Sequence, residues 1–134
     1  MAKYRNRTFE NEFGRWDSQL EYYRYLVLRD AESRGEITGL QRQRQYELIP
    51  AQQAECVSRR TVRNGTTVKR TLKTVEKSCT YRADFTYFLS DGTEIVEDTK
   101  GYRTKEYVIK RKLMRLQGHP IREVRNANEP ILLP

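Results

Sequence analysis

Charged residues that could act together lie in two adjacent runs with strand character. Asp84 lies in the first run, and Asp98 and Lys100 lie in the second. Side chains alternate faces along a strand, so Asp98 and Lys100 share a face while Thr99 points to the other. Aspartates held close together repel each other, and a divalent hard cation with oxygen ligands relieves that repulsion. The pattern therefore predicts a metal site beside a lysine.

The register of this hairpin decides whether Asp84 joins the site. The dipeptide Asp91-Gly92 is typical of a tight turn, because both residues tolerate positive φ angles. A two-residue loop would place Asp84 opposite Thr99. A three-residue loop over 90–92, with Gly92 left-handed as a bulge, would place Asp84 opposite Asp98. We predict the bulged register for the pairing of 81–89 with 93–100.

The order and spacing of these residues resemble the PD-(D/E)XK nuclease signature. The fuller pattern is similar to a phage-encoded group of endonuclease or Holliday-junction-resolvase-like proteins, which has a D-S-x-x-E helix, a Y-x-A-D-F strand and a V-E-D-x-K-G strand. These motifs correspond here to 17–21, 81–85 and 96–101, and the resemblance spans roughly residues 16 to 125. Ala83 departs from the general signature, which has Pro at that position.

The resemblance implies a catalytic set of Glu21, Asp84, Asp98 and Lys100 that works with Mg²⁺, for which Mn²⁺ substitutes, and with no small-molecule cofactor. Asp84 and Asp98 would ligate the metal, and the Thr99 carbonyl would add an oxygen. Glu21 would complete the shell directly or through water. Lys100 would orient or help deprotonate the attacking water, or neutralise developing charge.

The resemblance also implies the reaction and the substrate. We expect hydrolysis of DNA phosphodiester bonds by an endonuclease acting on branched DNA, such as Holliday junctions in phage recombination or replication. The alternatives are a nicking or terminase-associated endonuclease, and a non-catalytic nucleic-acid-binding protein on the same fold. A homodimer would favour the resolvase, because that enzyme must cut two strands symmetrically.

A helix over 18–34 must position Glu21. Ser18 is a candidate N-cap and Gly35 a stop, and apolar residues repeat at helical spacing as Leu20, Tyr23, Val27 and Ala31. We expect that stripe to face the sheet, with Glu21 at its edge leaning toward the hairpin. Ser18-x-x-Glu21 is also a capping box, and the two roles of Glu21 are compatible.

The remaining elements predict an α/β (α+β) fold, with a restriction-endonuclease-like core and a mixed central sheet flanked by helices. Residues 36–50 alternate as a first strand. Gln43 corresponds to a Gln of the resembled group; we expect it on a solvated strand face, with a place at the cleft as the alternative. Thr104 caps a second helix that runs to Gln117, with an expected buried stripe of Ile109, Leu113 and Leu116, and 121–124 forms a last short strand.

The length of 134 residues fits one domain, 1–134. We expect a basic N-terminal arm over 1–16, anchored by Phe13 and Trp16, and a C-terminal tail over 126–134 whose Ile131, Leu132 and Leu133 dock on the core or on a partner.

No apolar run approaches the ~18 residues of a membrane span, which predicts a cytoplasmic protein without a membrane partner, located in the host cytoplasm if it is phage-encoded. Cys56 and Cys79 are isolated and the chain has one His, so the sequence does not predict a zinc site, and we expect reduced thiols.

The charge predicts DNA as the partner. Lys and Arg number 26 against 18 Asp and Glu, a net charge of +8. A basic β-hairpin insertion over 54–78 turns at Asn64-Gly65, and 58–77 carries seven cations against one acid. The alternative to DNA binding is a solvated surface. The predicted nucleic-acid-binding residues are Arg59, Arg60, Arg63, Lys69, Arg70 and Lys73 in the insertion, and Arg103, Lys105, Lys110, Arg111 and Lys112 at the second helix.

Overall fold

The computed structural model describes residues 7–100 and 102–131. Its chain divides into two compact units. The first, here called the core unit, comprises Met1–Tyr46 and Tyr81–Pro134. The second, here called the arm, comprises Glu47–Thr80. The arm is therefore longer at both ends than the insertion predicted over 54–78.

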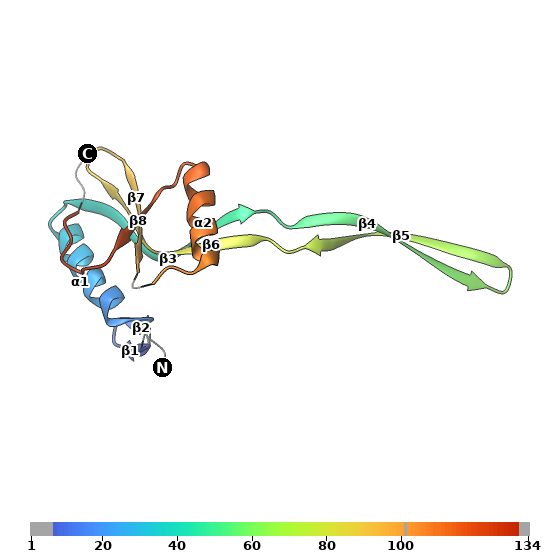
Figure 1. The fold of residues 1–134 in the computed structure, drawn as a ribbon, viewed down its shortest axis with the longest axis horizontal. Helices are drawn as coiled ribbons and strands as arrows, with labels where there is room; N and C mark the ends of the chain where they lie inside the picture. Colours follow the sequence, from blue (N-terminus) through green and yellow to red (C-terminus); the bar gives the residue numbers. More distant parts are fainter. Residues whose placement is uncertain (1–6, 101, 132–134) are drawn as a thin grey trace. The chain divides into compact units, whose positions relative to one another are not determined.

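A mixed sheet forms the centre of the core unit (Figure 1). Its strand order is β3-β6-β7-β8, with bounds Ile37–Ile49, Cys79–Leu89, Glu94–Thr99 and Ile121–Val124. Strands β6 and β7 pair antiparallel, whereas β7 and β8 pair parallel. A parallel pair needs a crossover, and helix α2 (Lys105–Leu116) provides it. With helix α1 (Gln19–Ser33) on the other side of the sheet, the predicted mixed sheet flanked by helices is confirmed.

The bulged hairpin register is confirmed. Phe85 lies opposite Glu97, and the Leu89 amide donates to the Thr93 carbonyl at 2.9 Å. The loop is therefore 90–92, and Gly92 closes it at φ 88°. A side chain at this φ would be strained, so the glycine selects the three-residue loop.

The limits of α1 are as predicted, but its buried face is not. Ser18 caps the helix, and Gly35 follows it at φ 78°. Glu21, Arg24, Leu28 and Ala31 are buried, whereas Tyr23 of the predicted stripe is 51% exposed. The helix is rotated relative to the apolar pattern because two charged side chains find partners inside the protein, which makes their burial tolerable.

The described part of the N-terminal segment is an ordered hairpin rather than an irregular arm. Strands β1 (Phe9–Asn11) and β2 (Gly14–Trp16) pair antiparallel. Trp16 is fully buried with Leu28, and Phe13 packs against the same cluster, so both predicted anchors are confirmed. Residues 1–6 lie outside the described residues. Ile131 also packs against this cluster, as predicted, whereas Leu132 and Leu133 lie outside the described residues.

Helix α2 likewise begins and ends as predicted but buries other residues. Thr104 caps it, and Gly118 follows at φ 91°. Tyr107 and Met114 are buried, while Ile109 is 60% and Leu116 is 82% exposed. The predicted buried stripe is therefore wrong. The Tyr107 ring is part of the buried face, and a face that includes Tyr107 and Met114 turns Ile109 and Leu116 toward solvent.

The arm is a two-stranded ribbon. Strands β4 (Gln52–Val62) and β5 (Gly65–Glu76) pair antiparallel, and nearly every residue in them is exposed. Val62 pairs with Gly65, so the loop is Arg63-Asn64 rather than Asn64-Gly65, and Gly65 adopts φ 135° at its end. Cys56 and Cys79 are free thiols, as predicted.

Candidate active site

A pocket of about 300 Å³ in the core unit collects the predicted residues. Its lining comes from the start of α1, from β3, from both strands of the central hairpin and from α2. The lining residues are Asp17, Gln43, Tyr81, Arg82, Asp84, Asp98, Lys100, Thr104, Glu106, Tyr107 and Lys110. Three of the four predicted catalytic residues, Asp84, Asp98 and Lys100, therefore share one pocket.

Asp84 lies where the hairpin ladder ends. The ladder's last pair at this end is Phe85 with Glu97. Beyond it, Asp84 Oδ2 accepts hydrogen bonds from the amide and the hydroxyl of Thr99, both at 2.8 Å. The Asp84 carboxylate thus accepts the Thr99 amide proton in place of a main-chain carbonyl of β6. This contact fixes residues 98–100, which include Asp98 and Lys100. Metal ligation by the Thr99 carbonyl stays a prediction.

Asp98 is buried between a like charge, Asp84, and an opposite charge, Lys100. It is 3% exposed, and its Oδ2 accepts a hydrogen bond from the Tyr81 hydroxyl. Burial, and then the neighbouring Asp84 carboxylate, raise the pKa of Asp98 to about 7. Lys100 Nζ lies 3.2 Å from Asp98 Oδ1 and 4.3 Å from the centre of the Tyr107 ring, and both contacts hold the ammonium at the pocket.

Glu21 lies behind the pocket wall rather than on its surface. The side chain is buried, with Oε2 accepting from the Asp17 amide at 3.0 Å and Oε1 from Gln43 Nε2 at 2.7 Å. Burial, and then Asp84, raise the pKa of Glu21 to about 7. Only half of the capping box forms as predicted: Ser18 Oγ accepts from the Glu21 amide at 3.1 Å, but the Glu21 carboxylate binds the amide of Asp17 and not that of Ser18.

The carboxylates of the pocket fit a hard cation in part. Mg²⁺ commonly binds through one or two carboxylates and keeps several waters, which Asp84 and Asp98 can satisfy. Burial, and then the like charge of Asp84, raise the pKa of Asp98, and a cation shared by the two carboxylates would offset both effects. Among the residues that the structure describes, no three acidic, His or Cys side chains are close enough to enclose an ion. Glu21, whose two oxygens are already engaged, would therefore contribute through water in this arrangement.

Gln43 belongs to the site, which corrects its expected place on a solvated face. Its φ is 58°, in the left-handed region, and it breaks the alternation of β3: Arg42, Gln43 and Arg44 are all half-buried. The turned side chain reaches Glu21 and lines the pocket. Arg42 supports this bend by stacking over Trp16 at 3.4 Å and lying 3.7 Å from Glu21 Oε1. The Gln in the resembled motif was the sequence signal for this role.

Two arginines extend the site beyond the predicted residues. A second pocket of about 400 Å³ is lined by Arg15, Asp17, Gln43 and Arg82, and it shares the last three with the first pocket. The two pockets therefore adjoin each other, and together they are here called the groove. Arg15 and Arg82 are exposed in the second pocket, Arg82 also lines the first, and Lys110 lies in the first with the catalytic candidates. Isolated arginines at alternating or turn positions gave no signal in the sequence.

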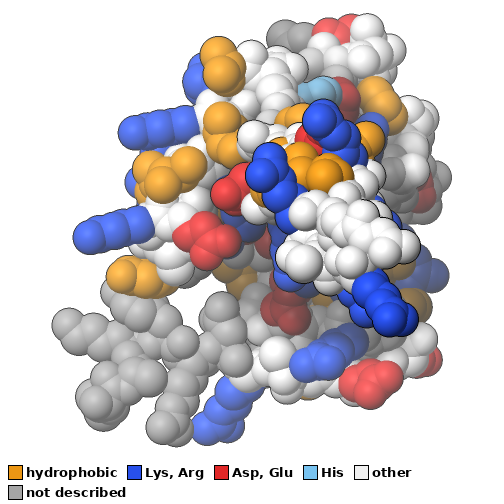
Figure 2. Space-filling model, turned by 90° about the vertical axis from the view of Figure 1, so that its right-hand side faces the viewer, with side chains coloured by type: hydrophobic (Ala, Val, Ile, Leu, Met, Phe, Trp, Pro, Cys, Tyr) orange, Lys and Arg blue, Asp and Glu red, His pale blue; other side chains and the backbone are white. Residues whose placement is uncertain are grey.

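The predicted cations at α2 fall into distinct environments. Arg103 binds Glu123 through two hydrogen bonds, and Arg111 lies 3.6 Å from the same carboxylate. Lys110 faces the pocket and pairs with Glu106 at 3.0 Å. Lys105 and Lys112 are exposed. The space-filling view shows Lys and Arg side chains at several places on one side of the molecule, with Asp and Glu side chains among them (Figure 2).

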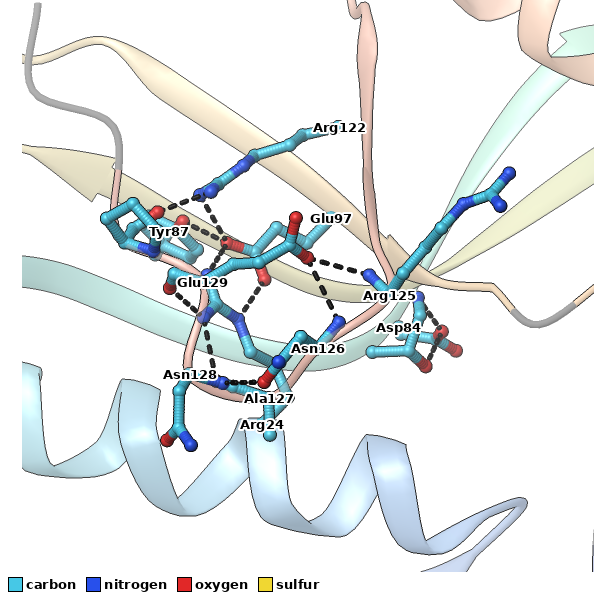
Figure 3. A network of polar contacts seen from close by, with 12 residues as sticks. Arg24, Asp84, Tyr87, Glu97, Arg122, Arg125, Asn126, Ala127, Asn128 and Glu129 are labelled. Carbon is cyan, nitrogen blue, oxygen red and sulfur yellow. Dashed lines mark hydrogen bonds and ion pairs between the residues drawn. The ribbon is translucent and has the colours of Figure 1, made fainter.

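A buried ion pair holds β7 against α1 (Figure 3). Alternation on β7 sends Glu97 to the face opposite Asp98, where Arg24 Nε and Nη2 bind its two oxygens at 2.8 Å. Arg24 Nη1 also donates to the carbonyls of Ala127 and Glu129, which ties the C-terminal segment to the helix. Both charges are fully buried. Glu97 is thus structural, although it lies next to Asp98 in the motif.

The comparisons with known proteins give a family without an activity. The model of the family described as Protein of unknown function (DUF1064) matches residues 1–128. The chain belongs to the DUF1064 family. No curated protein and no solved structure matches it. For this DUF1064 protein, neither helix of the described part has the length and apolar content of a membrane crossing.

Proposed function

We propose that the protein is a metal-dependent DNA endonuclease that hydrolyses phosphodiester bonds in branched DNA, such as a Holliday junction. The observation that supports this most is the meeting of Asp84, Asp98 and Lys100 in one pocket, with the pKa of Asp98 raised to about 7. A buried acid whose pKa is raised by another acid is typical of a functional site. A protein that only binds DNA would not require such an acid. The cytoplasm, of the host if the gene is phage-borne, is the proposed compartment.

In this proposal Asp84 and Asp98 hold a Mg²⁺ ion, and Mn²⁺ substitutes for it. The ion, when bound, activates a water and neutralises charge on the phosphate oxygens. Tyr81 orients Asp98 through its hydroxyl, and Thr99 orients Asp84 through its amide and hydroxyl. Lys100, placed by Asp98 and the Tyr107 ring, orients the attacking water or neutralises charge on the phosphate.

The cations of the groove support an internal site on a strand. Arg15, Arg82, Lys100 and Lys110 line the two adjoining pockets, and Asp84 and Asp98 line the first of them. Cations bind phosphates on either side of the bond to be cut and offset the repulsion between the backbone and the acidic centre. We therefore propose that the protein cuts within a strand that lies in the groove and not from the end of a strand.

The test is incubation with a four-way junction, linear duplex DNA and single-stranded DNA, each with Mg²⁺, Mn²⁺ or EDTA. We expect cleavage with Mg²⁺ or Mn²⁺ and none with EDTA, and the junction to be cut best. A circular single strand, which has no ends, separates internal from terminal cleavage. Absence of metal-dependent cleavage of every substrate would show that the proposal is wrong.

A second candidate is a non-catalytic nucleic-acid-binding protein on a nuclease-like fold. Two observations favour it. Both Glu21 oxygens are engaged by the Asp17 amide and Gln43, and no three acidic, His or Cys side chains of the described residues are close enough to enclose an ion. Glu21→Gln separates the two candidates. In the nuclease, loss of this charge lowers the activity of the folded protein by about 10- to 100-fold, as for groups that support metal ligands. In a binding protein, the variant affects neither metal affinity nor DNA affinity.

A further inference from the structure

The strand register of the arm separates its charges onto two faces. Directly paired residues of antiparallel strands point to the same face, and neighbours along a strand point to opposite faces. The pairs Ala54–Lys73, Ser58–Lys69 and Arg60–Thr67 therefore share one face, here called the lysine face. The pairs Glu55–Leu72, Val57–Arg70 and Arg59–Val68 share the other, here called the aliphatic face.

The lysine face has the properties of a surface for a polyanion. Arg60, Lys69 and Lys73 are exposed on it, and no acid lies on it over the continuous register from Gln53 to Thr74. The residues between these cations are small: Ala54, Cys56, Ser58, Thr67 and Thr71. A ribbon face with short side chains between long cationic ones can lie close to a phosphate backbone without steric hindrance.

The aliphatic face differs in both charge and chemistry. Val57, Val68 and Leu72 are 50%, 49% and 71% exposed on it. The acid on this face, Glu55, forms an ion pair with Arg70 at 3.2 Å. The structure describes all residues of 47–80, and this is the ion pair within them. One of the two arginines on this face is thus already neutralised, and exposed aliphatic groups separate the charges.

We propose that the arm binds the phosphate backbone of duplex DNA with its lysine face alone. The proposal rests on DNA being the partner in the proposed function, but it does not require cleavage. Along one strand Lys69 and Lys73 are four residues, about 14 Å, apart, and Arg60 lies diagonally across from Lys69 at about 7–8 Å. A duplex carries one negative charge per roughly 1.7 Å of its axis, so this row of cations meets several phosphates.

The chain offers a matched pair of variants that tests the choice of face. Arg60→Gln with Lys69→Gln removes two cations from the lysine face, and Arg59→Gln with Arg70→Gln removes two cations from the adjacent positions on the aliphatic face. Each pair takes one charge from β4 and one from β5. The measurement is the affinity of the full chain for a fluorescent linear duplex in EDTA, over a range of salt concentrations.

Each phosphate contact contributes about 0.9 to the slope of log affinity against log salt concentration. We expect the lysine-face variant to flatten this slope by up to about 1.8 and the aliphatic-face variant to leave it almost unchanged. Equal flattening by both variants, flattening by the aliphatic-face variant alone, or no change in either would overturn the proposal. Circular dichroism verifies that both variants keep the fold.

Two controls keep this proposal separate from the others. If the wild type binds duplex in EDTA with the expected pattern but cuts nothing with Mg²⁺, the arm proposal stands and the nuclease proposal fails. If it cuts DNA but the lysine-face variant binds as the wild type does, the arm proposal alone fails. Sedimentation velocity without DNA completes the test, because a change of oligomeric state in the lysine-face variant would make that face a protein interface and overturn DNA binding there.

Discussion

The pocket and the arm place charge in opposite ways. At the pocket, Asp98 in the lining and Glu21 behind the wall are almost fully buried, and each accepts a hydrogen bond from a neighbouring side chain. In the arm, cations such as Lys69 and Lys73 stand on an exposed ribbon where little else fixes them. Burial makes the first set chemically responsive, because it raises the pKa of the acids. Because the cations of the arm are exposed, they attract anions over a distance that depends on the salt concentration.

The largest effect is expected from changing the pocket's charges. We expect Lys100→Met and Asp98→Asn each to lower the rate of metal-dependent DNA cleavage by about 10²- to 10⁴-fold, the range for groups that handle protons or charge in the reacting complex. Single-turnover cleavage of a four-way junction at saturating protein measures the chemical step. The matched control in the arm is Lys73→Met, which should leave the rate at saturation unchanged because it alters binding only.

A folded Lys100→Met protein that cuts at the wild-type rate would contradict the assignment. Equal losses in Lys100→Met and Lys73→Met at saturation would contradict the comparison itself, since the arm would then take part in chemistry.

The buried ion pair sharpens the comparison through stability. Arg24→Met leaves the Glu97 carboxylate without its main partner inside the protein, and we expect a loss of about 3–5 kcal/mol in the free energy of unfolding. Arg122, 3.5 Å from Glu97, moderates the loss. Arg70→Met breaks an exposed pair, for which we expect a change of less than about 1 kcal/mol. Denaturation by urea measures the free energy of unfolding of both variants. Similar losses in Arg24→Met and Arg70→Met would show that burial does not make the ion pair of the core unit more important for stability than that of the arm.

The pH dependence follows from the raised pKa values. In the unfolded chain Asp98 releases its proton near its ordinary pKa of 3.8, and in the folded, metal-free protein near about 7. Between these values the folded state binds more protons, so its stability falls as pH rises. Glu21 acts in the same direction. Since one pKa unit corresponds to about 1.4 kcal/mol and both pKa values rise by more than two units, we expect a loss on the order of several kcal/mol between about pH 4 and about pH 8.

Calorimetry in EDTA tests this expectation. Asp98→Asn should reduce the loss, and the variant should be more stable than the wild type at about pH 8, because the charge that burial disfavours is gone. Mg²⁺ should stabilise the wild type at that pH and have little effect on Asp98→Asn. A metal-free wild type that gains stability as pH rises through this window would show that the carboxylates are structural.

The limits of the elements could be predicted because their signals are local. Ser18 and Thr104 cap the helices, Gly35 and Gly118 follow them, and Gly92 closes the hairpin loop. Each signal depends on the backbone of a few residues, so the sequence contains it directly. The hairpin register, and with it the meeting of the two aspartates in the pocket, followed from that loop.

The helix faces and the pocket walls could not be predicted, because they depend on partners far apart in the chain. Apolar periodicity cannot place Arg24 inside the protein, since its partner Glu97 is 73 residues away. The turn of Gln43 toward Glu21 depends on a left-handed residue inside a strand, which no turn dipeptide marks. The faces of the arm became visible only with the register of β4 and β5.

The smallest effect is expected from a substitution in the arm that would be severe in the core. Leu28 is fully buried and Leu72 is 71% exposed, so Leu→Ala at the two sites is the same chemical change in opposite surroundings. We expect Leu28→Ala to lower the free energy of unfolding by about 2–5 kcal/mol and Leu72→Ala to change it by less than about 0.5 kcal/mol. Urea denaturation of both variants checks this difference. A loss above about 1 kcal/mol for Leu72→Ala would mean that the aliphatic face is covered in solution, and the loss would then depend on protein concentration if a second copy covers it.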